Sequence, residues 1–225
     1  MSVITKKQII ERVKTDDITF VPPPDTLQLQ EHSVDLRLGF TFMVPKIWHL
    51  TTHGREALEI THFDKNNAGF FDVVELEEGQ YFELLPQEYI LVSTLETIKI
   101  PKDLMAILYP RSSTNRKGLS LDLTGIVDSG YEGQLTLPLR NNTRSQSVRL
   151  YPGERICQIV FEELKEPVNA RKSKYHKKDI IEGVAREKRD EASYILKGDI
   201  KKLKVSLRSL SRPKKRKTRI DALAA

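Results

Sequence analysis

Two short stretches of the sequence gather side chains that could handle a phosphorylated ligand. The first, "PRSSTNRKGL" at residues 110–119, contains Arg111, Ser112, Ser113 and Arg116. Guanidinium groups and hydroxyls donate hydrogen bonds, and the planar guanidinium matches the geometry of phosphate oxygens. The stretch therefore indicates a phosphate-binding loop, although serines at such positions are also typical of an exposed loop that begins a helix.

The second stretch, "GIVDSGYEGQL" at residues 125–135, places a carboxylate and an aromatic ring on either side of a Ser-Gly corner. These two residues, Asp128 and Tyr131, interrupt runs that otherwise favour buried strand. Aspartate is common before Ser-Gly because its side chain stabilises turns, so the residues by themselves leave a purely structural role open for Asp128.

Other reactive residue types show no pattern of this kind. The five histidines have neither metal-ligand spacing nor a catalytic partner in the sequence, and the single cysteine, Cys157, excludes an internal disulfide and a multi-cysteine zinc site. Cys157 lies in an apolar run and is typical of a packing residue.

The elements that must position these residues are mostly short strands. Apolar residues at helical spacing in "ITKKQIIERVKTDDI" predict one short helix near the N-terminus, with Thr5 as its cap. The strand-like runs that follow are "SVDLRLGFTFMV", "GFFDVVEL", "YFELLPQEYILVSTLETIKI", "LMAILYP", "QLTLPLRN", "QSVRLYP" and "RICQIVFEEL". Many short strands separated by turns predict a mainly β fold, a distorted jelly-roll or β-barrel.

The charge distribution divides the chain near residue 170. Residues 1–170 carry 18 Lys and Arg against 24 Asp and Glu, whereas residues 171–225 carry 19 against 7. We therefore predict a β domain over residues 1–170 and a basic C-terminal arm over residues 171–225, helical or partly disordered. Such an arm could bind nucleic acid through its phosphates or simply remain solvated.

Four stretches, taken together and in this order, resemble the superfamily shared by trimeric dUTPases and dCTP deaminases. They are "HSVDLRLG" (32–39), "PRSSTNRKGL" (110–119), "GIVDSGYEGQL" (125–135) and "GERICQIVF" (153–161). The resemblance extends from the N-terminus to about residue 165. It implies a homotrimer with sites shared between subunits, and a substrate that is deoxyuridine or deoxycytidine triphosphate.

The resemblance also implies roles for single residues. Asp128 would bond the sugar 3′-hydroxyl or orient the attacking water, and Tyr131 would pack on the deoxyribose and leave no room for a ribose hydroxyl. Arg111, Ser112, Ser113, Arg116 and Gln158 would bind the nucleotide. Mg²⁺ would be held mainly by the triphosphate and by water, so we expect no dedicated metal cluster.

One position separates the two branches of the superfamily. The deaminase branch supplies its proton-transfer group as a glutamate ten residues after the hairpin aspartate, and this sequence has Pro138 there. Proline has neither a carboxylate nor an N–H, and Glu132 in the turn comes too early to replace it. The 17-residue spacing from Arg111 to Asp128 also favours a dUTPase.

The sequence therefore predicts hydrolysis of dUTP to dUMP and pyrophosphate. The alternatives are a dCTP deaminase, a bifunctional dCTP deaminase and dUTPase, or a weakly active nucleotide-binding regulatory protein.

The glycine-rich C-terminal motif of dUTPases is missing, and "RKSKYHKKD" is its nearest replacement. There Tyr175 could stack on the base and Lys174 could meet phosphate, unless the segment is a solvated linker. With neither a signal peptide nor a long apolar run, we expect a cytoplasmic protein without membrane contact.

Overall fold

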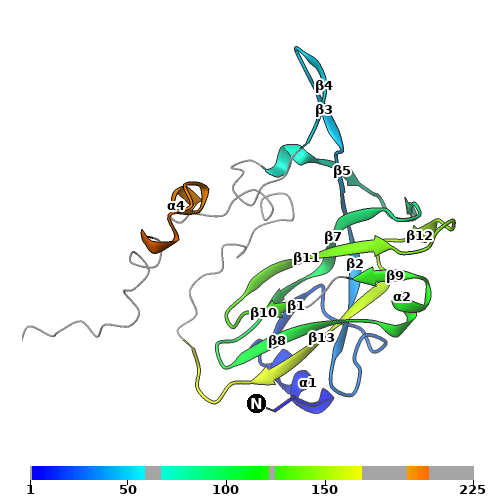
Figure 1. Ribbon diagram of the computed structural model, residues 1–225. Coiled ribbons are helices and arrows are strands. Elements are labelled where there is room, and N and C mark those ends of the chain that lie inside the picture. Colours follow the sequence, from blue (N-terminus) through cyan, green and yellow to red (C-terminus); the bar gives the residue numbers. More distant parts are fainter. Residues whose placement is uncertain (1, 59–66, 122–124, 169–191, 203–225) are drawn as a thin grey trace, which may run out of the picture. The chain divides into compact units, whose positions relative to one another are not determined.

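The computed structural model describes residues 2–58, 67–121, 125–168 and 192–202 (Figure 1). Nine strands form the main sheet: β1 (Thr19–Val21), β2 (Val34–Pro45), β5 (Phe71–Glu75), β7 (Tyr89–Lys99), β8 (Leu104–Pro110), β9 (Leu119–Leu121), β10 (Ile126–Val127), β11 (Glu132–Asn141) and β13 (Arg155–Glu163). Two smaller antiparallel pairs join β3 (Trp48–Thr51) to β4 (Gly54–Ala57), and β6 (Phe82–Leu84) to β12 (Val148–Leu150). The predicted strand runs are confirmed.

The main sheet is antiparallel and curls around β2. Its order is β10-β8-β13-β2-β7-β11-β9, with β1 beside β7 and β5 beside β2. The first part of β2 pairs with β13, its last residues pair with β5 and β7, and the register with β7 shifts between Leu38 and Phe42. Gly39 lies at this shift, where a Cβ atom would collide with Ser93 Oγ and lie 2.9 Å from the Thr94 carbonyl oxygen. The close approach of the two strands therefore requires glycine.

The core follows from alternation along the strands. In β11 the side chains of Leu135, Leu137 and Leu139 are buried, while the residues between them face outward or are half-exposed. Burying leucine-sized side chains stabilises the fold by about 1.5–3 kcal/mol each. Cys157 is fully buried in the same core, as predicted, and its burial raises the pKa of the thiol. The mainly β, barrel-like fold is confirmed.

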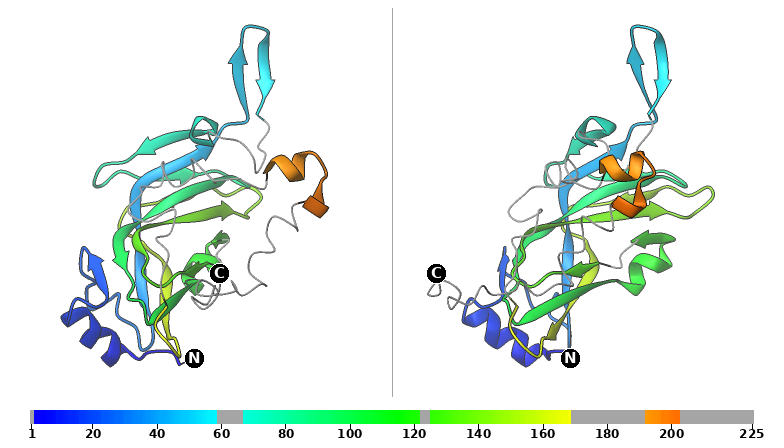
Figure 2. Two further views of the ribbon diagram at one scale, coloured as in Figure 1. Left: turned by 90° about the vertical axis from the view of Figure 1, so that its left-hand side faces the viewer. Right: turned by 60° about the vertical axis from the view of Figure 1, so that its left-hand side comes forward.

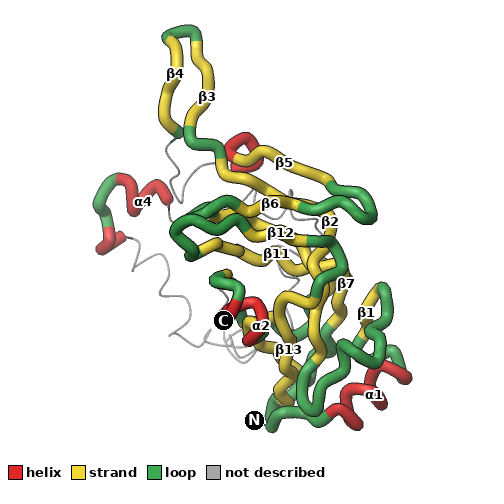
Figure 3. The backbone as a smooth tube through the Cα atoms, turned by 90° about the vertical axis from the view of Figure 1, so that its right-hand side faces the viewer, coloured by secondary structure: helices red, strands yellow, loops and turns green. Residues whose placement is uncertain are grey.

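Helices are few and short in the described part of the chain (Figure 3). The predicted N-terminal helix is α1 (Lys6–Lys14), which begins after Thr5, whose backbone N–H donates to Gln8 Oε1 at 2.8 Å. Ile9 is buried and docks α1 on the β body. The other helices are η1 (Asn67–Phe70), α2 (Ser112–Arg116) and α4 (Ala192–Leu196).

Two regions differ in how far the sequence anticipated them. The β3–β4 hairpin, which extends away from the main sheet in both views of Figure 2, was not predicted because its side chains are mostly exposed and give no alternation. The C-terminal arm was predicted as partly helical, and α4 is a helix within it. Most of the arm lies outside the described residues, so its predicted boundary at residue 170 and its binding of nucleic acid stay predictions. None of the helices in the described ranges has the length and apolar character needed to cross a bilayer.

Candidate functional site

The phosphate-binding loop predicted from the sequence begins where β8 ends. Arg111 precedes α2 with an extended backbone, and its side chain turns toward β2 and β13. Its Nε lies 3.1 Å from Asp35 Oδ2, and its NH1 group donates to the Arg155 carbonyl oxygen at 3.0 Å. A guanidinium has five N–H donors, so Arg111 retains further donors for an incoming anion.

Asp35 holds a second guanidinium as well. Arg155 NH1 lies 3.1 Å from the same Oδ2 atom, and the Asp35 side chain is only 3% exposed. Burial raises the pKa of Asp35 above its ordinary value, while Arg111 and Arg155 oppose that rise. A buried carboxylate with two guanidinium partners fixes the position of both, because releasing either would leave the charge less compensated.

The remaining polar residues of the loop lie on α2 and are open to solvent. Ser112, Ser113 and Arg116 are exposed, whereas Thr114 is buried and donates its hydroxyl to the Ile156 carbonyl oxygen at 2.9 Å. Thr114 thus holds the helix against β13 while its polar neighbours face outward. This is the arrangement that a phosphate-binding loop needs.

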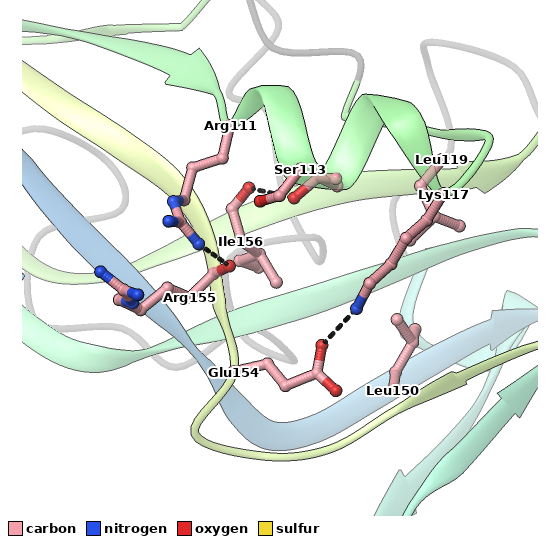
Figure 4. A pocket seen from close by; sticks show the side chains of 9 residues that line it. Arg111, Ser113, Lys117, Leu119, Leu150, Glu154, Arg155 and Ile156 are labelled. Carbon is pink, nitrogen blue, oxygen red and sulfur yellow. Dashed lines mark hydrogen bonds and ion pairs between the residues drawn. The ribbon is translucent and has the colours of Figure 1, made fainter.

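A pocket of about 230 Å³ lies between α2 and the start of β13. It is lined by Arg111, Ser113, Thr114, Lys117, Leu119, Leu150, Glu154, Arg155 and Ile156. Figure 4 shows that the side chains of Arg111 and Lys117, which flank α2, both extend toward β13. Three cationic side chains and one carboxylate line the pocket, which favours an anionic ligand.

Gln158, whose binding to the nucleotide stays a prediction, lies close to this region. It pairs with Asp35 of β2 on one side and with Tyr109 of β8 on the other. Its side chain is half-buried, and Oε1 accepts a hydrogen bond from Ser33 Oγ at 3.2 Å. Gln158 therefore lies beside the carboxylate that anchors the two arginines.

Asp128 lies in a different place. It follows β10 and opens a tight turn in which the Tyr131 N–H donates to the Asp128 carbonyl oxygen at 3.1 Å. Ser129 is buried and donates its hydroxyl to the Leu104 carbonyl oxygen at 2.5 Å, which fixes the turn against β8. The Asp128 side chain is exposed. A fixed backbone with a solvent-facing carboxylate can present that carboxylate to a ligand from outside.

Tyr131 is held tightly within the chain. Its side chain is 7% exposed, and its hydroxyl donates to the Gln134 carbonyl oxygen at 2.6 Å. Burial raises the pKa of Tyr131 to about 12, so the phenol stays protonated at neutral pH. Its contact with a deoxyribose stays a prediction.

The two predicted halves of the site are not brought together within one chain. Val127 pairs with Ala106, which places Asp128 level with the first residues of β8, whereas Arg111 follows the last residue of β8. About six residues of extended strand separate the two levels, roughly 20 Å. Within one chain, Arg111 and Asp128 therefore lie at opposite ends of β8.

Comparison with known proteins places the chain in a family. Residues 3–164 match the family model described as dCTP deaminase-like. The chain belongs to the dCTP deaminase-like family. A protein of Dictyoglomus turgidum named "dCTP deaminase, dUMP-forming" is 43% identical over 152 residues, 67% of this chain and 73% of the relative. A protein of Methanobrevibacter smithii with the same name is 35% identical over 184 residues, 79% of this chain and 91% of the relative.

A solved structure agrees with the fold of this dCTP deaminase-like protein. The 2′-deoxycytidine 5′-triphosphate deaminase of Agrobacterium tumefaciens superposes with a TM-score of 0.55 at 24% identity. The match covers 71% of this chain and 48% of the Agrobacterium chain. The family model and the two relatives confirm the resemblance inferred from the four stretches.

Pro138 lies within β11 of this dCTP deaminase-like chain, opposite Leu91 of β7. It is half-exposed and lies between the buried Leu137 and Leu139, so its ring faces away from the core. Glu132 is the first residue of the same strand, at the other end of β11 from Asn141. Tyr175 and Lys174 lie outside the described residues, and their roles stay predictions.

Sequence reasoning missed three residues that shape the dCTP deaminase-like site. Asp35 and Arg155 lie within quoted stretches but were not singled out, and Lys117 was treated only as part of its loop. A signal for Asp35 exists: it is a charged residue among the buried apolar residues of "SVDLRLG", and a buried carboxylate requires cationic or hydrogen-bonding partners. The identity of those partners depends on strand pairing, which the sequence does not show.

Proposed function

We propose that this protein forms dUMP and pyrophosphate from a pyrimidine deoxynucleoside triphosphate. Water would attack the α-phosphorus, and the bond from that phosphorus to the bridging oxygen would break, with pyrophosphate as the leaving group. The observation that carries the proposal is the Arg111 side chain, held at the edge of a cationic pocket by the buried Asp35. A guanidinium fixed in advance loses little freedom when it binds phosphate.

The chain's own residues supply binding and orientation. Arg111 and Arg155 offer charge-assisted hydrogen bonds to phosphate oxygens, and Ser112 and Ser113 offer hydroxyls next to them. Asp128 would orient the attacking water or the sugar 3′-hydroxyl, and Tyr131 would support the hairpin that carries it. Because Asp128 and Arg111 lie at opposite ends of β8, we propose that the site forms between copies in a homotrimer.

We propose that magnesium enters the site as an ion carried by the substrate. Among the described residues, no group of three or more His, Cys, Asp or Glu side chains is placed to hold a metal ion. Oxygen atoms of the triphosphate and water would then be its main ligands, as is usual for Mg²⁺. When bound, the ion neutralises charge on the phosphates.

The starting nucleotide is best assigned as dCTP. Relatives at 43% and 35% identity are named "dCTP deaminase, dUMP-forming", and that name supports dCTP more than the dUTP that the sequence alone predicted. With dCTP, a second water would replace the exocyclic amino group and release ammonia. This step needs a proton-transfer group beside the base.

A second candidate, hydrolysis of dUTP without deamination, is favoured by one observation. Pro138 occupies the position at which the deaminase branch carries its glutamate, and proline cannot move a proton. A chain that deaminates dCTP must therefore take its proton-transfer group from elsewhere in the site.

The test is a product analysis of the full-length protein with dCTP and with dUTP, each with and without Mg²⁺. Chromatography would resolve dUMP and dCMP, and coupled assays would measure pyrophosphate and ammonia. Ammonia and dUMP from dCTP support the first candidate, while dUMP from dUTP with unchanged dCTP supports the second. Binding of either nucleotide without turnover would contradict both and indicate a regulatory nucleotide-binding protein.

A further inference from the structure

The pocket beside α2 contains one cation that is held very differently from the other two. Lys117 Nζ lies 3.2 Å from Glu154 Oε2 (Figure 4). The two side chains are 52% and 30% exposed. Arg111 and Arg155 are instead held by Asp35, which is 3% exposed. The pocket thus combines two fixed guanidinium groups with one ammonium group whose partner is at the surface.

Exposed ion pairs are weak. Water screens both charges, and holding two long side chains in one geometry costs conformational entropy, so such a pair contributes about 0–1 kcal/mol. An ammonium group on a four-carbon stem carries three rotatable donors and can turn to a new acceptor. Lys117 can therefore leave Glu154 at little cost when a stronger anion enters the pocket.

The backbone of Lys117 is fixed even though its side chain is not. Lys117 caps the C-terminus of α2, and its N–H donates to the Thr114 carbonyl oxygen at 3.1 Å. Gly118 follows with a φ of +79°, and a Cβ atom there would lie 2.6 Å from Thr143 Cγ2. A side chain at this position would be strained, so Gly118 favours the turn that holds the Lys117 backbone at the rim of the pocket.

We propose that Lys117 is a further substrate-binding residue, which exchanges the Glu154 carboxylate for an oxygen of the pyrophosphate part of the substrate. Glu154 then acts as a competitor for the lysine, because it must be displaced before phosphate can bind. This inference rests on the proposed function, since it places the triphosphate of that reaction in this pocket. It adds a lysine and a competing glutamate to the residues predicted from the sequence.

The test uses two single substitutions that remove the same ion pair from opposite sides. Lys117→Ala removes the phosphate-binding cation, so the Kd for inorganic pyrophosphate and the KM for the nucleotide should rise about tenfold, the effect of about 1.4 kcal/mol. Glu154→Gln frees the lysine, so both constants should fall several-fold. Isothermal titration calorimetry of the full-length protein with pyrophosphate and Mg²⁺ gives the Kd without requiring turnover.

The opposite signs distinguish a binding role from a structural one. If the pair merely joined α2 to β13, both substitutions would lower the melting temperature and shift the binding constants in the same direction, and that result would overturn the proposal. Lys46→Ala is the matched control. Lys46 Nζ lies 3.0 Å from Asp72 Oδ1, and neither residue lines the pocket. Its Kd for pyrophosphate should equal that of the parent.

The two proposals can fail separately. If neither dCTP nor dUTP is turned over but pyrophosphate binding responds to the two substitutions with opposite signs, the proposed function is wrong and the pocket assignment is supported. If turnover proceeds and neither substitution changes the Kd or the KM, the Lys117 assignment is wrong and the proposed function stands.

Discussion

Two carboxylates lie near opposite ends of β8, and the chain holds them in opposite ways. At the end near α2, Asp35 is buried and engaged by Arg111 and Arg155. At the other end, Asp128 is exposed on a turn whose backbone is fixed by the buried Ser129. One carboxylate is committed to partners in its own chain, and the other faces outward.

This difference separates a positioning carboxylate from a reactive one. A buried carboxylate that compensates two guanidinium groups is held in place by them, because moving it would leave buried charges less compensated. An exposed carboxylate on a rigid turn can orient a water, provided that another surface closes over it and excludes bulk solvent. The comparison therefore supports an anchoring role for Asp35 and agrees with the proposal that Asp128 takes part in the chemistry.

The largest expected effect concerns the anchored end. Arg111→Ala should lower the free energy of unfolding by about 3 kcal/mol, because it leaves the buried Asp35 with one guanidinium fewer. Arg111 lowers the pKa of Asp35, so its removal raises that pKa further. The decrease in the free energy of unfolding should therefore be largest at neutral pH. It should become smaller as the pH falls and Asp35 becomes protonated. Urea denaturation at several pH values measures it.

The control for this substitution comes from the same helix. Arg116 is exposed on α2, so Arg116→Ala should change the free energy of unfolding by less than about 0.5 kcal/mol. Equal losses for the two alanine variants would show that the Asp35 anchor does not set the stability of this end.

The reactive end should respond in activity instead of stability. Asp128→Asn keeps the shape of the side chain but removes its charge, and dUMP formation should fall by on the order of 10² or more. Because the side chain is exposed, the melting temperature should stay within about one degree of the parent. Steady-state kinetics and thermal denaturation of the same preparation check both halves of the prediction. Parent-like turnover by the variant would remove Asp128 from the mechanism.

The sequence predicts the features of this molecule that depend on residues close together in the chain. Alternation of apolar residues is local, so strands such as β2, β11 and β13 were predicted with nearly their observed bounds. The candidate loop and the Asp128 turn were also predicted, because each is contained in one short stretch.

The interactions that the sequence did not show are those between distant strands. Asp35 meets Arg111 and Arg155 only because β13 lies between β8 and β2 in the sheet, and sheet order is not visible in single stretches. The separation of Asp128 from Arg111 likewise depends on the antiparallel pairing of β10 with β8. The exposed β3–β4 hairpin lacks a buried face and so gave no periodic signal.

A smaller effect is expected for the residue that supports the reactive end. Tyr131→Phe removes the hydrogen bond to the Gln134 carbonyl oxygen and should lower the free energy of unfolding by about 1 kcal/mol at neutral pH. Burial raises the pKa of Tyr131 from 10.0 to about 12, so between these values the folded state binds more protons than the unfolded chain.

The sign of the pH dependence follows from that proton difference. The stability of the parent should fall as the pH rises through this window, by at most about 1.4 kcal/mol per unit from this group, and the phenylalanine variant lacks that contribution. The advantage of the parent over Tyr131→Phe should therefore shrink above about pH 10, where this window opens. A constant difference up to that pH and beyond would mean that the Tyr131 hydroxyl is not buried in solution.

The smallest expected signal is a partial recovery of activity, which tests whether Arg111 of one chain and Asp128 of another share a site. Arg111→Lys keeps a cation beside Asp35 but loses the guanidinium fork. Asp128→Asn loses the carboxylate charge at the other end of β8 and keeps Arg111. Each variant alone should therefore be nearly inactive. The two variants are co-expressed with different tags, and assemblies that contain both are purified through both tags.

In a cyclic trimer every mixed assembly has one interface at which an unchanged Arg111 meets an unchanged Asp128. Activity should therefore return to about one third of the parent. A mixed dimer of the same kind would return about one half. No recovery in doubly purified material would mean that Arg111 and Asp128 do not share a site across an interface, which would break the comparison on which the mechanism rests.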